Sequence, residues 1–268
     1  MTSLNAWFEN LLFGCAGEAD SAETHGASIT VIGSGGKTSL IWHLSASFAM
    51  RSGRKILVTP ATKMFVPPPE TKLYDRYYGR CNDGILPEPV PGITLAGHFN
   101  ETNGKLESLP PSQLEKMLAG YDLVLIEGDG SRGLPLKAWT KNEPVIPSST
   151  SLCIGMLPLW PLGKPVSESL VHRLPLFLAL TGAGPGEPIR PEHIERLITG
   201  RQAESGAVPL PGLFTKARGK KVLFFNQIEN EGALTQAREM AELLPPRFRE
   251  GLCGIIAGSV RDDCVVEL

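Results

Sequence analysis

A glycine-rich segment between an apolar run and an amphipathic run constrains the fold of this chain more than any other feature. Ser28–Ile32 has the composition of a buried strand, and the segment Gly-Ser-Gly-Gly-Lys-Thr-Ser follows it directly at Gly33–Ser39. Lys37–Arg51 then carries apolar residues at helical spacing. Glycines let a backbone curl so that successive N–H groups point at one anion, and a helix N-terminus adds partial positive charge. The segment therefore predicts a phosphate-binding loop.

Each residue of this loop is a candidate phosphate contact: Gly33, Ser34, Gly35, Gly36, Lys37, Thr38 and Ser39. The Lys37 ammonium can reach the β- and γ-phosphates of a nucleoside triphosphate, and the Thr38 hydroxyl can ligate Mg²⁺. The longer GxxxxGK[ST] motif requires glycine where this chain has Val31, so the loop has the shorter GxxGK[ST] form. It resembles the loop of Mur ligases and folylpolyglutamate synthases. The alternative is a glycine-rich turn that binds no ligand.

Short apolar runs along the chain predict the rest of the fold. Those that indicate strands are Ile29–Ile32, Lys55–Thr59, Ile93–Ala96, Leu123–Ile126, Leu152–Met156, Val222–Phe225 and Gly254–Ala257. Helices are predicted at Lys37–Arg51, Ser112–Ala119, Ser167–Leu180, Pro191–Thr199 and Ala233–Leu244. Most of the strands are continuously apolar, which is typical of a parallel sheet covered on both faces. The alternation predicts an α/β, P-loop NTPase-like, doubly wound and mostly parallel sheet flanked by helices.

The length of 268 residues is enough for one large α/β domain. We predict a single domain over residues 1–268, in which residues 1–27 form an N-terminal helix and a linker. The C-terminal half is expected to be partly helical, and the region of about 148–214, which is poor in strands, can form a helical subdomain.

Charge and cysteine usage limit the partners of the chain. The net charge of −2 gives no sign of a strongly basic face, so no nucleic-acid partner is expected. No apolar run reaches about 18 residues, so no membrane partner is expected either. The five cysteines have no CxxC spacing, which favours reduced thiols over disulfides or zinc ligands. The N-terminus does not have the pattern of a signal peptide. These features together predict a cytoplasmic protein.

Acidic and basic residues follow the predicted strand at Leu123–Ile126. Glu127 and Asp129 come directly after it, and Arg132 and Lys137 lie a few residues further on. Carboxylates at the carboxyl end of a parallel strand suit Mg²⁺ beside a bound polyphosphate. The two cations can neutralise charge on a phosphate or a second substrate. The alternative is a surface Asp-Gly turn with a solvated arginine.

Two further strand ends carry candidate binding residues. Thr59 ends the second predicted strand, where it can sense a γ-phosphate or a metal ion, although ordinary turn chemistry explains it equally well. Asn226 and Glu229 form an N-Q-x-E segment at the place where many GTPases carry N-K-x-D. A carboxylate there can accept hydrogen bonds from a purine. The alternative is an ordinary loop after a strand.

Several motifs occur together in one order: Val31–Leu40 (VIGSGGKTSL), Val58–Phe65 (VTPATKMF), Ile126–Trp139 (IEGDGSRGLPLKAW), Asn142–Pro147 (NEPVIP), Val171–Arg173 and Asn226–Glu229. By the content and order of these motifs, the chain resembles the YqeC family of selenium-dependent molybdenum hydroxylase accessory proteins. The resemblance covers about residues 28–230 and is most specific between residues 127 and 147. It implies a role in maturing such hydroxylases, with the molybdopterin cofactor or the apo-hydroxylase as a partner.

Three functional hypotheses follow. The first is an Mg²⁺-dependent enzyme that hydrolyses a nucleoside triphosphate or transfers its nucleotidyl or phosphoryl group, with the base unspecified. Its catalytic residues would be Lys37, Glu127, Asp129 and Arg132, and its metal ligands Thr38, Glu127 and Asp129. The second is a nucleotide-gated chaperone without significant turnover. The third is a ligase of the Mur type, for which the chain is short.

Overall fold

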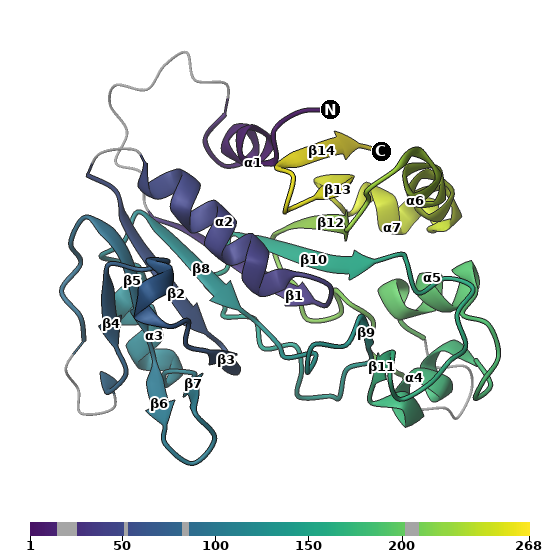
Figure 1. Ribbon diagram of the computed structural model, residues 1–268, viewed down its shortest axis with the longest axis horizontal. Helices are drawn as coiled ribbons and strands as arrows, with labels where there is room; N and C mark the ends of the chain where they lie inside the picture. Colours follow the sequence, from purple (N-terminus) through teal and green to yellow (C-terminus); the bar gives the residue numbers. More distant parts are fainter. Residues whose placement is uncertain (15–25, 51–52, 82–85, 202–208) are drawn as a thin grey trace.

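A nine-stranded, mostly parallel sheet forms the centre of the protein within the residues that the computed structural model describes, which are 1–14, 26–50, 53–81, 86–201 and 209–268 (Figure 1). The strands are β1 (Ala27–Gly33), β2 (Lys55–Pro60), β4 (Arg76–Tyr78), β5 (Gly92–Ala96), β8 (Leu123–Glu127), β10 (Leu152–Pro158), β12 (Lys220–Asn226), β13 (Gly254–Ser259) and β14 (Cys264–Glu267). Their order is β14-β13-β12-β10-β1-β8-β2-β5-β4. Only β14, which pairs with β13, is antiparallel among these strands.

Helices pack on both faces of this sheet and bury its central strands on both sides. The helices are α1 (Leu4–Phe13), α2 (Lys37–Ala49), α3 (Pro111–Leu118), α4 (Leu174–Thr181), α5 (Pro191–Thr199), α6 (Glu231–Leu243) and α7 (Pro246–Glu250). Side chains of α1 and α2 share one hydrophobic cluster with β1, β8 and β10. A second cluster joins α4, α5 and α6 to β10, β12 and β13, and a third joins α3 to β2 and β8. The molecule therefore has the layers of a doubly wound α/β protein.

Strand β1 lies at the middle of the sheet, and its position decides where a site can form. The chain leaves β1 through α2 and returns on one side at β2, whereas β10 lies on the other side. Ligands of open α/β sheets bind at such a change of direction, beyond the carboxyl ends of the strands. The ends of four parallel strands meet there: Gly33 of β1, Glu127 of β8, Pro158 of β10 and Asn226 of β12.

In the part of the chain that the structure describes, two small sheets stand apart from the central one. One contains β3 (Lys63–Phe65), β7 (Lys105–Glu107) and β6 (His98–Asn100) in that order, all antiparallel. The other pairs β9 (Leu136–Lys137) with β11 (Val171–His172). The 3₁₀ turn η1 (Pro69–Thr71) lies between β3 and β4. Both small sheets contribute residues to the rim of the site described below.

The sequence-based prediction of an α/β, P-loop-like fold is confirmed, and all seven predicted strands belong to the central sheet. One predicted helix, Ser167–Leu180, is wrong at its start. Val171 and His172 pair with β9, and Arg173 has a left-handed backbone with φ of 64°, so the helix begins at Leu174. Strands β4 and β14 were not predicted. The predicted linker falls mostly within residues 15–25, which lie outside the described residues. None of the helices in the described part has the length and apolar content that crossing a bilayer requires.

Candidate functional site

The glycine loop connects β1 to α2 in a conformation that only glycine adopts readily. Gly33, Gly35 and Gly36 have φ values of 98°, 76° and 118°. Space is also restricted, because a Cβ on Gly33 would lie 2.2 Å from the Met156 carbonyl oxygen. The Ser34 N–H donates to that same oxygen over 2.9 Å. The spacing of the glycines is therefore explained by both backbone conformation and close approach to β10.

Lys37 and Thr38 begin α2, where the first backbone N–H groups of a helix have no intrahelical partner. The Lys37 side chain is 4% exposed, and its Nζ donates to the Gly33 carbonyl over 2.6 Å. The ammonium therefore lies over the loop. Together, the amides and the ammonium form a concave, positively charged surface of the kind that binds anions.

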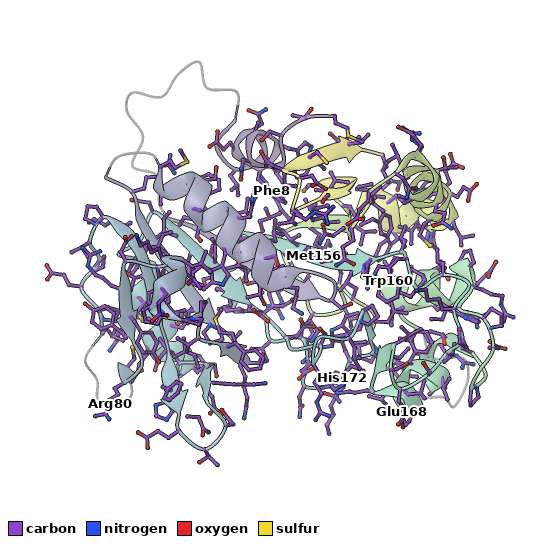
Figure 2. All side chains as sticks on the ribbon, viewed as in Figure 1. Phe8, Arg80, Met156, Trp160, Glu168 and His172 are labelled. Carbon is purple, nitrogen blue, oxygen red and sulfur yellow. The ribbon has the colours of Figure 1, made fainter. Side chains whose placement is uncertain are left out.

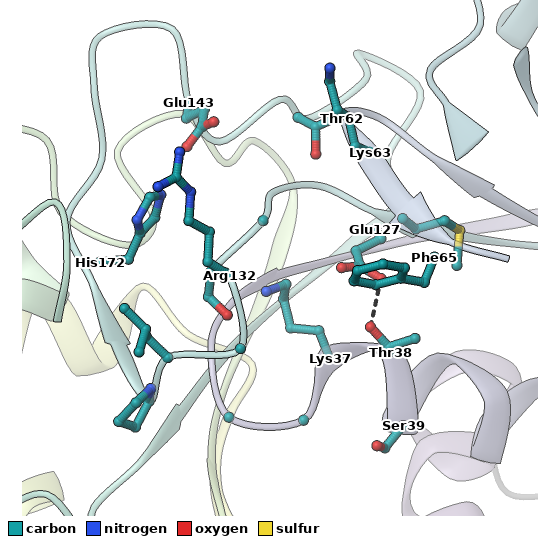
Figure 3. A pocket seen from close by; sticks show the side chains of 18 of the residues that line it. Lys37, Thr38, Ser39, Thr62, Lys63, Phe65, Glu127, Arg132, Glu143 and His172 are labelled. Atoms are coloured by element: carbon teal, nitrogen blue, oxygen red, sulfur yellow. Dashed lines mark hydrogen bonds between the residues drawn. The ribbon is translucent and has the colours of Figure 1, made fainter. Parts of the chain in front are cut away.

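Glu127 faces the loop from the end of β8. The Thr38 hydroxyl donates to its Oε2 over 2.8 Å, as the dashed line in Figure 3 shows. Glu127 is 6% exposed, and burial raises the pKa of its carboxyl, while the charge of Lys37 and the Thr38 hydrogen bond act in the opposite direction. A hydroxyl and a carboxylate thus meet beside the loop.

Asp129 lies only two residues further on, but its surroundings are different. It is fully buried, and its carboxylate accepts hydrogen bonds from the Gly33 N–H over 3.0 Å and from Trp139 Nε1 over 2.6 Å. The Nζ atoms of Lys137 and Lys37 lie 2.9 Å and 3.4 Å from it. Asp129 therefore binds the loop from inside the protein, and these partners occupy both of its oxygens.

Lys137 extends this arrangement into a buried ion network, which we define as Asp129, Lys137, Trp139, Glu143 and Arg173. The fully buried Lys137 ammonium donates to the Gly130 carbonyl over 2.8 Å and to Glu143 over 3.1 Å. Arg173 pairs with the same Glu143 oxygen over 2.6 Å. Burial acts to raise the pKa of Glu143, but the Arg173 hydrogen bond and the Lys137 charge outweigh it and lower the pKa to about 2.

A pocket of about 840 Å³ opens along the loop. It is lined by loop residues 35–39, by Glu127, by β3, by residues 130–135, by Glu143, by His172 and Arg173, and by Trp160 and Gln227. Among the described residues, five cationic side chains line it, against two carboxylates: Lys37, Lys63, Lys105, Arg132 and Arg173, against Glu127 and Glu143. Because the cations outnumber the carboxylates, the pocket favours an anionic ligand.

Arg132 and His172 lie at the rim of this pocket that is remote from β3 (Figure 3). Arg132 has a left-handed backbone with φ of 55° and an exposed side chain. The pKa of His172 is lowered to about 4, first by burial and then by the positive charge of Arg173 and of its cationic neighbours. The imidazole is therefore neutral at physiological pH, so one ring nitrogen can donate a hydrogen bond and the other can accept one.

The structure separates the remaining predicted site residues. Thr59 is fully buried, and no hydrogen bond among the described residues satisfies its hydroxyl. The nearby Thr62 and Lys63 line the pocket instead. Asn226 supports the loop, because its Nδ2 donates to the Gly35 carbonyl over 2.7 Å and its Oδ1 accepts from the Val260 N–H over 3.0 Å. Glu229 is half exposed and pairs with Arg261 over 3.3 Å.

Sequence reasoning missed several residues that line the pocket: Phe65, Lys105, Glu143, Trp160 and Gln227. Each comes from a segment without a phosphate-binding signature, and the tertiary fold brings them to the loop. One signal was available, because Phe65, Glu143 and Gln227 lie within the motifs that carry the family resemblance.

The fold and the geometry of the site define the class of protein to which this chain belongs. The chain is an α/β protein with a P-loop-like fold, in which a glycine loop at the centre of a parallel sheet faces a carboxylate on the neighbouring strand. A family model described as "YqeC protein" matches residues 29–175. "Uncharacterized protein YqeC" of Escherichia coli (strain K12) is 32% identical over 242 residues, which cover 87% of this chain and 88% of that protein. The chain therefore belongs to the YqeC family.

Proposed function

We propose that this protein binds a nucleoside triphosphate together with Mg²⁺ and hydrolyses it or transfers its nucleotidyl or phosphoryl group. The observation that carries the proposal is the 2.8 Å contact of Thr38 with Glu127 beside a left-handed glycine loop. The β- and γ-phosphates would lie on the loop amides, with Lys37 turned toward them from the Gly33 carbonyl.

The residues beside the loop fit a magnesium ion. Thr38 and Glu127 present hydroxyl and carboxylate oxygens, which are the hard donors that Mg²⁺ prefers, and these two residues would hold the ion together with phosphate and water oxygens. When bound, the ion would supply charge neutralisation to the phosphate oxygens. Asp129 is better suited to hold the loop than to hold the metal ion, because its oxygens are already bonded to Gly33, Trp139 and Lys137.

Catalysis in this proposal depends on position and charge. Lys37 and the loop amides bind and orient the phosphates, and Arg132 and Arg173 face the same pocket as further cations. The neutral His172 at the rim can hold a hydroxyl or an ammonium of a second substrate in place. Phosphoryl transfer needs little covalent chemistry from the protein, and such an arrangement is sufficient for it.

The family resemblance supplies the wider context of the proposal. We place the activity in the maturation of selenium-dependent molybdenum hydroxylases, with the molybdopterin cofactor or the apo-hydroxylase as the second partner. A thermal-shift panel of ATP, GTP and CTP with Mg²⁺, alone and with molybdopterin species, tests both parts, because a ligand that binds the folded state raises the unfolding temperature.

Variants of the loop make this test decisive. Lys37→Ala and Thr38→Val should abolish the nucleotide-dependent shift and any release of phosphate. Lys220→Ala, an exposed lysine at the opposite end of the central sheet, is the matched control and should change neither. Turnover of ATP, GTP or CTP that persists unchanged in Lys37→Ala rejects the proposal.

A nucleotide-gated chaperone is the second candidate, and one observation favours it. Phe65 on β3 is 70% exposed although it lies at the rim of the pocket, so an apolar contact surface adjoins the nucleotide site. In this case nucleotide binding would change the affinity for an apo-hydroxylase while turnover stays negligible. Hydroxylase capture that is indifferent to nucleotide and Mg²⁺ would exclude this candidate.

A further inference from the structure

The pocket continues past the glycine loop to an aromatic side chain. Trp160 and Gln227 line the same pocket as Gly35 and Lys37. Trp160 follows β10 and Gln227 follows β12, so both come from the half of the sheet opposite to Glu127. Figure 2 shows Trp160 beyond the carboxyl end of β10, past Met156. A ligand whose phosphates lie on the loop therefore has an indole ring within the same cavity.

The indole ring is exposed but fixed in orientation. Trp160 is 43% exposed, and its Nε1–H donates to Gln227 Oε1 over 2.9 Å. The Lys164 Nζ lies over the ring, 4.3 Å from its centroid. These two contacts hold the edge and one face of the indole. The other face can then stack on a planar group with little further loss of side-chain freedom.

Gln227 is held in turn by its backbone and its neighbours. Its φ of 67° lies in the left-handed region, which residues other than glycine rarely adopt. The preceding Asn226 bonds to the Gly35 carbonyl, and the following Ile228 N–H donates to the Gly258 carbonyl over 3.0 Å. The backbone that carries Gln227 is thus tied directly to the phosphate loop, and the indole keeps a set distance from it.

We propose that Trp160 is the platform on which the heterocyclic base of the bound nucleotide stacks, with Gln227 positioning the indole. The inference rests on the function proposed above and names the ligand group that occupies this end of the pocket. A stacking platform accepts any base, because every base has a π-face. The site should therefore bind purine and pyrimidine nucleotides with similar affinity, and should favour purines modestly for their larger ring.

Isothermal titration calorimetry on the full chain with Mg²⁺ tests this inference by comparing ATP with inorganic tripolyphosphate, which has no base. Trp160→Ala should weaken ATP binding about tenfold and leave tripolyphosphate binding within twofold. Trp160→Phe, which keeps an aromatic face, should recover most of the ATP affinity. Trp7→Phe, in α1, is the control and should change neither affinity. ATP should also quench tryptophan emission in the wild-type chain and in Trp7→Phe, but not in Trp160→Phe.

The outcomes separate the two proposals. Tripolyphosphate binding together with an ATP affinity that Trp160→Ala leaves unchanged overturns the base platform and preserves the phosphate site. Equal weakening of ATP and tripolyphosphate in both Trp160 variants also overturns it, because the indole would then only support the loop. Failure of the wild-type chain to bind either compound refutes the proposed function itself, and the base platform with it.

Discussion

Glu127 and Asp129 are two residues apart, yet they lie in two different regions of the molecule. Glu127 borders the pocket and has Thr38 as its hydrogen-bond partner beside the loop. Asp129 lies inside the buried ion network, where Gly33, Trp139 and Lys137 surround it. The first region leaves carboxylate oxygens available to a ligand, and the second uses them to hold the loop.

The difference shows that a short acidic segment can serve two purposes. Residues two apart face the same side of a sheet only while the strand continues, and β8 ends at Glu127, so Asp129 is free to point elsewhere. Hydrogen-bond donors then decide the outcome. Asp129 is surrounded by four donor groups, so it stabilises the structure, whereas Glu127 keeps a raised pKa and an opening to the pocket.

The largest expected effect comes from breaking the buried ion network. Asp129→Ala leaves the fully buried Lys137 ammonium and the Gly33 N–H without their carboxylate, and should lower the free energy of unfolding by about 3–5 kcal/mol. Urea unfolding at pH 7 measures this. Asp262→Ala, which removes an exposed partner of Arg261, is the control. A loss below about 1 kcal/mol for Asp129→Ala would remove the distinction between the two carboxylates.

Glu127→Gln should have the opposite effect from Asp129→Ala, with little change in stability and a large change in nucleotide affinity. The change removes a buried charge that burial already disfavours, so the free energy of unfolding should stay within about 1 kcal/mol of wild type. Nucleotide affinity in Mg²⁺ should fall at least about 10- to 100-fold, which is the loss typical of removing a residue that only orients a metal ligand. Calorimetric titration in the presence of Mg²⁺, and again in EDTA, measures the nucleotide affinity with and without the metal ion. Equal affinities of wild type and variant in Mg²⁺ contradict a metal-binding role for Glu127.

Acid titration sharpens the comparison further. The pKa of Glu143 falls from 4.5 to about 2 on folding, so its ionised form is favoured in the native state. This stability is fully present above about pH 4.5 and is lost as the pH falls toward 2. Glu127 has a raised pKa, so its contribution has the opposite sign and increases on protonation. Unfolding free energies measured against pH should show a flatter acid limb in Glu143→Gln and a steeper one in Glu127→Gln.

The smallest effect is expected at Glu229. Its ion pair with Arg261 joins two exposed side chains, and Glu229 lies outside the pocket lining. Glu229→Ala should change the free energy of unfolding by less than about 1 kcal/mol and leave the ratio of ATP to GTP affinity unaltered. Competition titration measures that ratio. A change of several-fold in the ratio of ATP to GTP affinity would show that Glu229 contacts the base.

Local sequence signals predicted most of the fold but only part of the site. Continuous apolar runs identified the central strands, and the glycine spacing located the loop, because both are properties of neighbouring residues. Strand β14 was missed because Cys264–Glu267 is short and only partly buried. The start of α4 was misplaced because Val171 and His172 pair with a distant strand, which the apolar content of the segment does not reveal.

The functional pairing of side chains was harder to predict. The contact of Thr38 with Glu127 agrees with the prediction that the loop and the acidic strand end lie together. Asp129 points into the protein because Trp139 and Lys137 contact its carboxylate. These two residues follow Asp129 in the chain, and Lys137 is held in place by the pairing of β9 with β11. Trp160 joins the site because β10 ends beside β1, a property of the sheet order and not of any local motif.

The pairing of β1 has a consequence for the kinetics of folding. Ile29 of β1 pairs with Leu125 on one side and with Leu152 on the other. The Gly35 carbonyl accepts its hydrogen bond from Asn226, which lies still further along the chain. During synthesis the glycine loop emerges long before these partners exist. Contacts so distant along the chain form slowly, so the phosphate site should be among the last parts to assemble. Acquisition of ligand binding during refolding would therefore report the completed sheet and not an early intermediate.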